Sequence, residues 1–249
     1  IMLCACGAEG TTTILNAARE PEIVDLQDFL NAIGAKVRGA GSSVITVEGK
    51  RPLHGGEHTV IGDRIVAATY LTAVAAAGGD VSVRGVDYRH LSTVTAVLRE
   101  AGCEVYSEKG RVRLTCAAPL KAVRPIHTAP YPGFPTDAQA PVMAALASAV
   151  GTTVFVENMF ENRYRHVDEL ARMGADIRVE GRVAVVSGVP RLHGSSVRAS
   201  DLRGGAALVV AALGAEGETV LTGLHHIDRG YERLEDDLRA LGAEIKRLE

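Results

Sequence analysis

Four times along the chain, an amphipathic run of residues ends at a glycine and passes into a β-branched segment. The four glycines recur at nearly constant spacing, at Gly34, Gly102, Gly174 and Gly242. Alanine or cysteine follows each glycine, and valine or isoleucine stands two positions further on. Glycine ends helices readily because it adopts the left-handed conformation without a Cβ penalty. The pattern therefore predicts four amphipathic helices, each ending at its glycine and followed by a strand.

A second pattern repeats in phase with the first. Alanine-rich runs end at glycines of nearly the same spacing and pass into strand-forming residues, at Gly10, Gly79, Gly151 and Gly217. The combined unit, which fills the interval between successive glycines, is a buried helix, a strand, an amphipathic helix and two strands. Such a unit resembles a βαβαββ fold. So long a period favours a few units around a shared core over a long solenoid.

Three of the buried helices share a start signal. Asp63, Asp137 and Asp201 each precede an apolar run, and their spacing is close to that of the glycines. If the three helices pack together, their N-termini bring free N–H groups and partial positive charge to one place. With Arg64 and Arg203 just inside two of these helices, an anion site is one interpretation. Three capped helices buried only for packing is the other, and the pattern leaves both open.

The second of these starts follows a proline-rich arm over residues 130–135. Three prolines and a glycine in this short stretch exclude a helix there and predict an extended segment. Thr136 and Asp137 are residue types that cap helices, and the apolar run 142–150 follows. The arm thus delivers a carboxylate to the first turn of a buried helix. Asp137 is either a cap alone or a group that performs chemistry.

Composition narrows the possible functions. The 249 residues are 47% hydrophobic and 23% charged, typical of a soluble globular protein of one or two domains. A net charge of −3, no tryptophan and 4% aromatic residues give no support for nucleic-acid binding. The four cysteines show no CxxC spacing and the eight histidines no ligand pattern, so we expect reduced, buried thiols and no metal.

The ends and connectors suggest how the chain is divided. The apolar opening over residues 1–6 is too short for a membrane span and lacks the basic start of a signal peptide. It is typical of the end of a buried helix, and we expect preceding residues to be missing. A polar connector at 51–58 predicts a domain boundary near Ile61, giving domains 1–61 and 62–249. A second connector covers 117–135.

Three loops carry candidate chemistry. Glu20 and Glu22 lie between a strand and a helix, where Glu22 and Asp25 can serve the helix start and Glu20 is held extended by the proline that follows it. Alternatively, the two glutamates and Arg19 bind a sugar or an amine. The loop 157–164 is dense in acids, amides and aromatic residues, which either satisfy loop backbone groups or form a ligand site. Arg229 precedes a predicted helix start, where the macrodipole favours acids, so we expect it to bind an anion together with Arg203.

At these motifs the sequence resembles the enolpyruvyl transferases, and among them the UDP-N-acetylglucosamine 1-carboxyvinyltransferases of bacterial cell-wall synthesis. The matching segments, in chain order, are 16–25, 63–65, 131–139, 160–164, 201–203 and 226–232. The resemblance implies an inside-out α/β barrel of repeated βαβαββ units, three in each of two domains that face each other across a cleft. Residues 1–61 would be the last unit of the first domain and 62–249 most of the second. Roughly the first two-fifths of such an enzyme would be absent.

The resemblance also implies a reaction and roles for residues. The family transfers the enolpyruvyl group of phosphoenolpyruvate to the 3'-hydroxyl of UDP-N-acetylglucosamine and releases phosphate, without a cofactor. Asp137 would be the acid/base at the hydroxyl, and Arg203 and Arg229 would hold the phosphoenolpyruvate-derived carboxylate and phosphate. Further substrate-binding residues implied by the matching motifs are Met159, Phe160, Glu161, Arg163, Arg64, Glu20, Glu22 and Asp201. A cytoplasmic location in cell-wall biogenesis, without membrane or nucleic-acid partners, would follow.

Two departures from the family pattern bear on activity. Gly204 and Gly205 stand where the family has a small pair containing serine, and glycine in a helix interior costs roughly 1 kcal/mol. The family's loop cysteine, N-terminal lysine and further arginines fall in the absent part, so we expect no turnover by this chain alone. The alternatives are one half of a split transferase, a non-catalytic UDP-sugar-binding or regulatory relative, and a transferase acting on shikimate phosphate. The segments 131–137 and 160–164 disfavour the last.

Overall fold

The computed structural model describes residues 1–117 and 119–248. Residue 118, inside the predicted connector 117–135, and residue 249, the end of the predicted second domain, lie outside the described residues. The chain forms two compact units, one of residues 1–62 with 130–133 and one of 63–129 with 134–249. Among residues 1–117 and 119–248, each helix is too short or too polar to span a membrane.

The first unit is a small three-stranded sheet with two helices. Its elements are α1 (Met2–Gly7), β1 (Thr11–Leu15), α2 (Pro21–Ala32), β2 (Lys36–Arg38) and β3 (Val44–Glu48). The strands are antiparallel in the order β1-β3-β2. The small core combines residues of α1, α2 and the two strands β2 and β3, namely Met2, Ala5, Cys6, Leu30, Val37, Ile45 and Val47. The opening segment is therefore a helix with one buried face, as its composition predicts.

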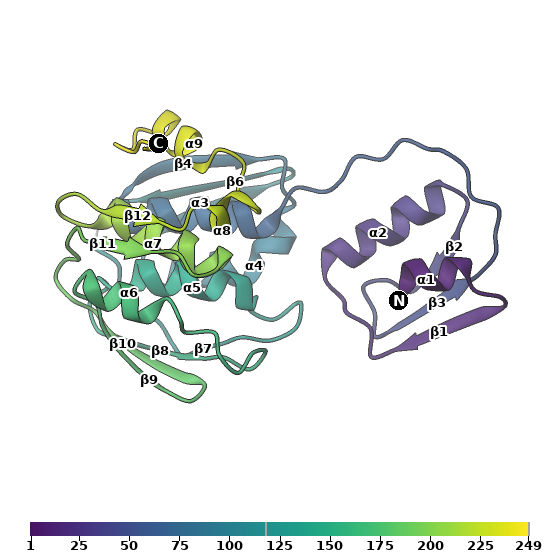
Figure 1. Cartoon of the computed structure of the whole chain (residues 1–249), viewed down its shortest axis with the longest axis horizontal. Coiled ribbons are helices and arrows are strands. Elements are labelled where there is room, and N and C mark those ends of the chain that lie inside the picture. Colours follow the sequence, from purple (N-terminus) through teal and green to yellow (C-terminus); the bar gives the residue numbers. More distant parts are fainter. Residues whose placement is uncertain (118, 249) are drawn as a thin grey trace. The chain divides into compact units, whose positions relative to one another are not determined.

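The second unit is built around three helices that pack against one another. These are α3 (Arg64–Ala77), α5 (Thr136–Leu146) and α7 (Leu202–Gly214). Most of their residues are buried, and in α5 every residue from Ala138 to Leu146 is buried. The strands lie outside these helices (Figure 1), with α3 against β4 and β6 and α5 against β8. Helices inside and sheets outside confirm the predicted inside-out α/β arrangement.

In the part of the second unit that the structure describes, three sheets surround these helices. The first has antiparallel order β4-β6-β5, from β4 (Gly79–Arg84), β5 (Glu104–Glu108) and β6 (Arg111–Cys116). The second has order β7-β8-β10-β9, from β7 (Ile126–His127), β8 (Thr152–Val156), β9 (Asp176–Glu180) and β10 (Val183–Ser187). The third pairs β11 (Ser196–Arg198) in parallel with β12 (Val220–Thr222). The outer helical segments are η1 (Tyr88–Leu91), α4 (Ser92–Glu100), α6 (Val167–Arg172), α8 (His225–Asp228) and α9 (Leu234–Ala240).

The repeat predicted from the glycines is present in these elements. From β7 to β10 the order is strand, helix, strand, helix, strand, strand, which is a complete βαβαββ unit. All eight glycines of the two patterns have φ between +78° and +122°. The strand predicted after Gly242 is wrong, because the described residues 243–248 form no strand. A strand needs a neighbour to satisfy its backbone groups, and no described strand pairs with this segment.

All four cysteines are free, but the expectation that all are buried is wrong for one of them. Cys6, Cys103 and Cys116 are buried, whereas Cys4 is exposed on α1. An amphipathic helix buries one face only, and Cys4 lies on the other. Burial, together with the neighbouring Cys116, raises the pKa of Cys103 to about 12. Because the thiolate is the reactive form, Cys103 is suited to packing rather than to nucleophilic chemistry.

Candidate active site

Asp137 does not cap its helix. The N-cap of α5 is Pro135, and its first turn contains Asp137 without a side-chain capping bond. The Asp137 carboxylate instead forms an ion pair through Oδ1 with Arg163, and its Oδ2 lies 3.3 Å from Nη2 of Arg203. The interpretation of Asp137 as a cap alone is therefore wrong. The carboxylate lies between two guanidinium groups that come from a loop and from α7.

Arg203 connects this carboxylate to the third buried helix. Its Nη1 donates to the hydroxyl of Tyr231 at 3.1 Å, and that hydroxyl lies 2.8 Å from Oγ1 of Thr69 on α3. Thr69 donates to the carbonyl of Ile65 at 3.0 Å, so the Tyr231 hydroxyl can donate to Thr69 while it accepts from Arg203. The N-terminal parts of α3, α5 and α7 are thus joined by one chain of polar contacts. The predicted convergence of these helix starts is confirmed.

The helix caps agree with the sequence pattern at the two other starts. Asp63 accepts from the backbone N–H groups of Ile65 and Val66, and Asp201 accepts from Gly204 N at 2.8 Å. Arg64 is buried as the first residue of α3. Asp201 therefore acts locally as a cap, and the described residues show no contact of its carboxylate with the Asp137 ion pairs. Two such helix starts add partial positive charge to the site.

The charge balance at the cluster favours an anionic ligand. Arg163 and Arg203 share one carboxylate, and their side chains are only 21% and 13% exposed. The Nε atom of each is buried and has no hydrogen-bond partner in the part of the chain that is described. Two partly desolvated guanidinium groups with one shared acid leave positive charge uncompensated. A phosphate or a carboxylate is the class of ligand group whose negative charge would compensate it.

The loop after β8 places aromatic surface beside this charge. Met159 and Phe160 are 41% and 50% exposed, and the guanidinium of Arg163 lies 5.0 Å from the Phe160 ring centroid. Glu161, by contrast, pairs with Arg182 at 3.6 Å. The structure therefore brings Phe160 and Arg163 to Asp137 and directs Glu161 to a different partner.

Arg229 is predicted to precede a helix start, but in the structure it follows the end of a helix. It is the C-cap of the short helix α8, it is exposed, and α9 begins only at Leu234. A cation is favoured at a helix C-terminus, so the local conflict inferred from the sequence does not exist. Among the described residues it forms no ion pair with Asp137 or any other acid.

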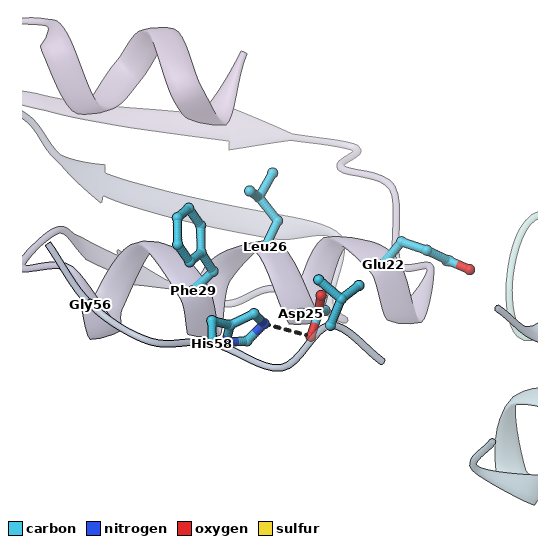
Figure 2. Close-up of a pocket in the computed structure, with 7 residues that line it drawn as sticks. Glu22, Asp25, Leu26, Phe29, Gly56 and His58 are labelled. Carbon is cyan, nitrogen blue, oxygen red and sulfur yellow. Dashed lines mark hydrogen bonds and ion pairs between the residues drawn. The ribbon is translucent and has the colours of Figure 1, made fainter. Parts of the chain in front are cut away.

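Glu20 and Glu22 lie at the start of α2 in the first unit. Glu20 is the N-cap in extended conformation before Pro21, and Glu22 is in the first turn. Glu22 also lines a pocket of about 370 Å³ formed by α2 and the segment that follows β3 (Figure 2). Asp25 lies in the same pocket and its Oδ1 is 3.0 Å from Nε2 of His58, as the dashed line in Figure 2 marks. The remaining lining residues are Leu26, Phe29, Gly56 and Val60.

Sequence reasoning missed several buried polar residues around the cluster. Glu157, Thr69, His166 and Gln139 are each at most 2% exposed. For Glu157 a signal existed, because the density of polar residues in the loop 157–164 suggested that some satisfy backbone groups. Gln139 closely follows Asp137 in α5 and has no separate signal in a run of small apolar residues.

Comparison with known proteins places the chain in a family. Residues 1–238 match the family model of EPSP synthase (3-phosphoshikimate 1-carboxyvinyltransferase). The chain belongs to this family of enolpyruvyl transferases. It is thus related to enzymes, as the resemblance implies, and the predicted family is confirmed.

Two curated relatives show which enolpyruvyl transferases the chain is similar to. The chain is 52% identical over 248 residues to UDP-N-acetylglucosamine 1-carboxyvinyltransferase 2 of Caldanaerobacter subterraneus, covering 100% of this chain and 60% of the relative. It is 54% identical over 248 residues to UDP-N-acetylglucosamine 1-carboxyvinyltransferase 1 of Symbiobacterium thermophilum, covering 100% of this chain and 56% of the relative. The chain therefore spans about three-fifths of the length of the curated relatives it matches.

Solved structures confirm the fold. The enolpyruvyl transferase NikO from Streptomyces tendae matches with a TM-score of 0.87 and 30% identity, over 98% of this chain and 58% of that one. EPSP synthase from Acinetobacter baumannii matches with a TM-score of 0.75 and 21% identity, over 100% of this chain and 60% of that one. The chain thus shares the enolpyruvyl transferase fold even with a protein to which its sequence identity is low.

Proposed function

We propose that this chain forms part of a transferase that moves the enolpyruvyl group of phosphoenolpyruvate to the 3'-hydroxyl of UDP-N-acetylglucosamine and releases phosphate. The observation that supports this most is the Asp137 carboxylate, held between Arg163 and Arg203 where the buried helices begin. The high identity to transferases of that name, over the whole chain, supports the choice of substrates. The reaction is the first committed step of peptidoglycan precursor synthesis.

The chemistry assigned to Asp137 is proton transfer at the sugar hydroxyl. A carboxylate that accepts this proton makes the hydroxyl oxygen a better nucleophile toward C2 of phosphoenolpyruvate. Protonation at C3 completes the addition and gives a tetrahedral ketal. Elimination of phosphate, with loss of a C3 proton, then yields the enolpyruvyl ether. Because Asp137 is already paired with two arginines, an incoming anion can draw one of them away and free the carboxylate.

Arg203 and Arg229 are proposed to hold the carboxylate and phosphate of the phosphoenolpyruvate unit. Fixed cations beside the reacting atoms stabilise the charge that develops in the tetrahedral state. For Arg203 the tether to Tyr231 supports this role, since a positioned guanidinium needs no reorganisation. Arg229 is exposed, which leaves it accessible to a ligand.

The remaining predicted residues complete the proposed substrate site. Met159, Phe160, Glu161 and Arg163 would contact the UDP-sugar, with the exposed Met159–Phe160 pair as an apolar surface. Arg64, Asp201, Glu20 and Glu22 are proposed to lie at or near the cleft. Residues 1–61 would be the last unit of one domain and residues 62–249 most of the other.

We place this activity in the cytoplasm, where the nucleotide sugar and phosphoenolpyruvate would be available. Its product would feed cell-wall biogenesis and thereby support cell shape, cell division and the cell cycle. Turnover would further require the groups that the family carries outside the matched part. A separately encoded other half is one alternative, and a non-catalytic UDP-sugar-binding relative is another.

The test measures phosphate released from phosphoenolpyruvate in the presence of UDP-N-acetylglucosamine. We expect none from this chain alone, and release once it is joined to the part of the Caldanaerobacter relative that it does not match. Asp137→Asn should abolish that release, whereas Asp168→Asn, at an exposed acid in the first turn of α6, should not change it. Binding of the nucleotide sugar without any release in the joined protein would favour the non-catalytic relative instead.

A further inference from the structure

Glu157 is a buried carboxylate whose role neither the ion pairs of the site nor the family comparison assigns. It follows β8 directly and is 1% exposed. A buried acid is costly unless polar partners replace the lost water. No lysine or arginine pairs with it in the part of the chain that is described. Its partners must therefore be neutral donors.

Four such donors surround it. Oε1 accepts from the Thr128 hydroxyl at 2.9 Å and from the backbone N–H groups of Met159 at 2.8 Å and Phe160 at 3.1 Å. Oε2 accepts from the Thr136 hydroxyl at 2.9 Å. A carboxylate can accept all four, and hydrogen bonds to a charged acceptor are stronger than neutral ones. We call Glu157 and these four partners the Glu157 network.

The donors come from three segments that are far apart in the sequence. Thr128 follows β7 and is fully buried, Thr136 is the first residue of α5, and Met159 and Phe160 belong to the loop after β8. Thr128 adds a second link to that loop, because its Oγ1 accepts from Asn158 N at 2.8 Å and its carbonyl accepts from Asn158 Nδ2 at 3.1 Å. One side chain thus holds the exposed loop to the start of α5.

Both segments carry residues of the proposed site. Thr136 is adjacent to Asp137, and the apolar side chains of Met159 and Phe160 remain 41% and 50% exposed although their backbone is anchored. Exposed apolar side chains on a fixed backbone are pre-organised for a ligand, because little conformational entropy is lost when it binds. We propose that Glu157 is a positioning residue that fixes the distance between the Asp137 carboxylate and the Met159–Phe160 surface.

This inference rests on the proposed function for its ligand, but its geometry can be tested without turnover. The first measurement is amide hydrogen exchange of Met159 and Phe160 in the chain. The loss of one hydrogen bond changes the equilibrium constant for local opening roughly tenfold. Glu157→Ala should therefore raise the exchange rates of both amides about tenfold. Glu157→Gln retains a carbonyl acceptor and should restore most of the protection. Glu180→Ala, at an exposed acid of β9, should leave both amides unchanged.

The second measurement separates the contact of Glu157 with Thr136, at the start of α5, from its contacts with the loop after β8. Turnover is followed in the chain joined to the unmatched part of the Caldanaerobacter relative. Thr136→Val removes the hydroxyl that anchors the start of α5 and should lower kcat about tenfold with KM for the nucleotide sugar within about twofold. Thr136→Ser retains the hydroxyl and should behave like the parent. Glu157→Ala should change both kcat and KM.

The outcomes distinguish this proposal from the proposed function. Unchanged exchange at Met159 and Phe160 in Glu157→Ala would overturn the positioning role, as would equal kcat for Thr136→Val and Thr136→Ser. If Glu157→Ala does not fold, the comparison of Thr136→Val with Thr136→Ser still decides, because only the serine keeps the hydroxyl that donates to Glu157. Absence of turnover in the parent joined protein would count against the proposed function alone, because the exchange measurement does not depend on it.

Discussion

His166 is a buried histidine that should make the second unit sensitive to mild acid. It is 2% exposed at the start of α6, and neither ring nitrogen has a hydrogen-bond partner among residues 1–117 and 119–248. Burial lowers its pKa from 6.5 to about 4, and the charge of Asp201 offsets only part of that effect. The folded protein thus holds the ring neutral in a pH range where the unfolded chain protonates it.

The direction and size of the effect follow from proton linkage. Between pH 6.5 and pH 4 the unfolded state binds more protons than the folded state, so stability falls as the pH falls. With pKa values of 6.5 unfolded and about 4 folded, the free energy of unfolding decreases by about 2 kcal/mol between pH 7.5 and pH 5. Below pH 4 the loss from this group reaches its limit.

The assay compares the parent chain with His166→Phe, which retains a planar ring and removes the titrating nitrogens. Urea unfolding followed by circular dichroism at pH 7.5 and pH 5 gives the change for each protein. The difference between the two changes isolates His166, because every other titrating group is common to both. His166→Gln serves as a second variant if phenylalanine is too large for the site. Space is limited on the side of Gly204, because a Cβ built on Gly204 would lie 3.1 Å from the Cβ of His166. Equal losses of stability in the parent and in both variants would refute the reasoning.

Two further substitutions test the packing around the site by urea unfolding at pH 7.5. Tyr231→Phe should destabilise the chain by about 1–2 kcal/mol, because the arginine and the threonine that its hydroxyl contacts lose a buried partner. Tyr106→Phe, at an exposed strand position, should change the free energy of unfolding by less than about 0.5 kcal/mol. Equal effects of the two tyrosine substitutions would contradict a stabilising link from Arg203 through the Tyr231 hydroxyl to Thr69. Gly205→Ala should destabilise by about 1 kcal/mol net, because its Cβ would lie 2.6 Å from Cγ1 of Ile227 and overpacking outweighs the gain in helix propensity. Gly7→Ala, with open space at the Cβ position, should not destabilise, and a stabilising Gly205→Ala would show that Ile227 moves aside.

The glycine pair at the start of α7 illustrates how packing changes a judgement made from propensity. From the sequence, Gly204 and Gly205 weaken a helix start. In the structure both are buried inside a regular helix that Asp201 caps, and a Cβ on either would approach a neighbour within 3.0 Å. The space available, which no local pattern encodes, makes glycine suitable there.

The candidate site shows the same division between local and distant causes. The convergence of three helix starts and the position of Asp137 in a first turn were predictable, since both depend on repeated patterns. The partners of Asp137 were not predictable from pattern, because Arg163 and Arg203 are 26 and 66 residues away in the chain. The sequence predicts a helix start after Arg229 because the four-residue helix α8 is too short to leave a periodic pattern.

Local sequence patterns predict the repeat, the helix ends at glycine and the caps at Asp63 and Asp201, and the structure contains all three. These features depend on backbone preferences that act over a few residues. The pairing of Asp137 with two arginines and the burial of Glu157 among four donors arise from the tertiary fold. Burial and ion pairing depend on which distant segments fold against each other, and for that reason they cannot be read from neighbouring residues alone.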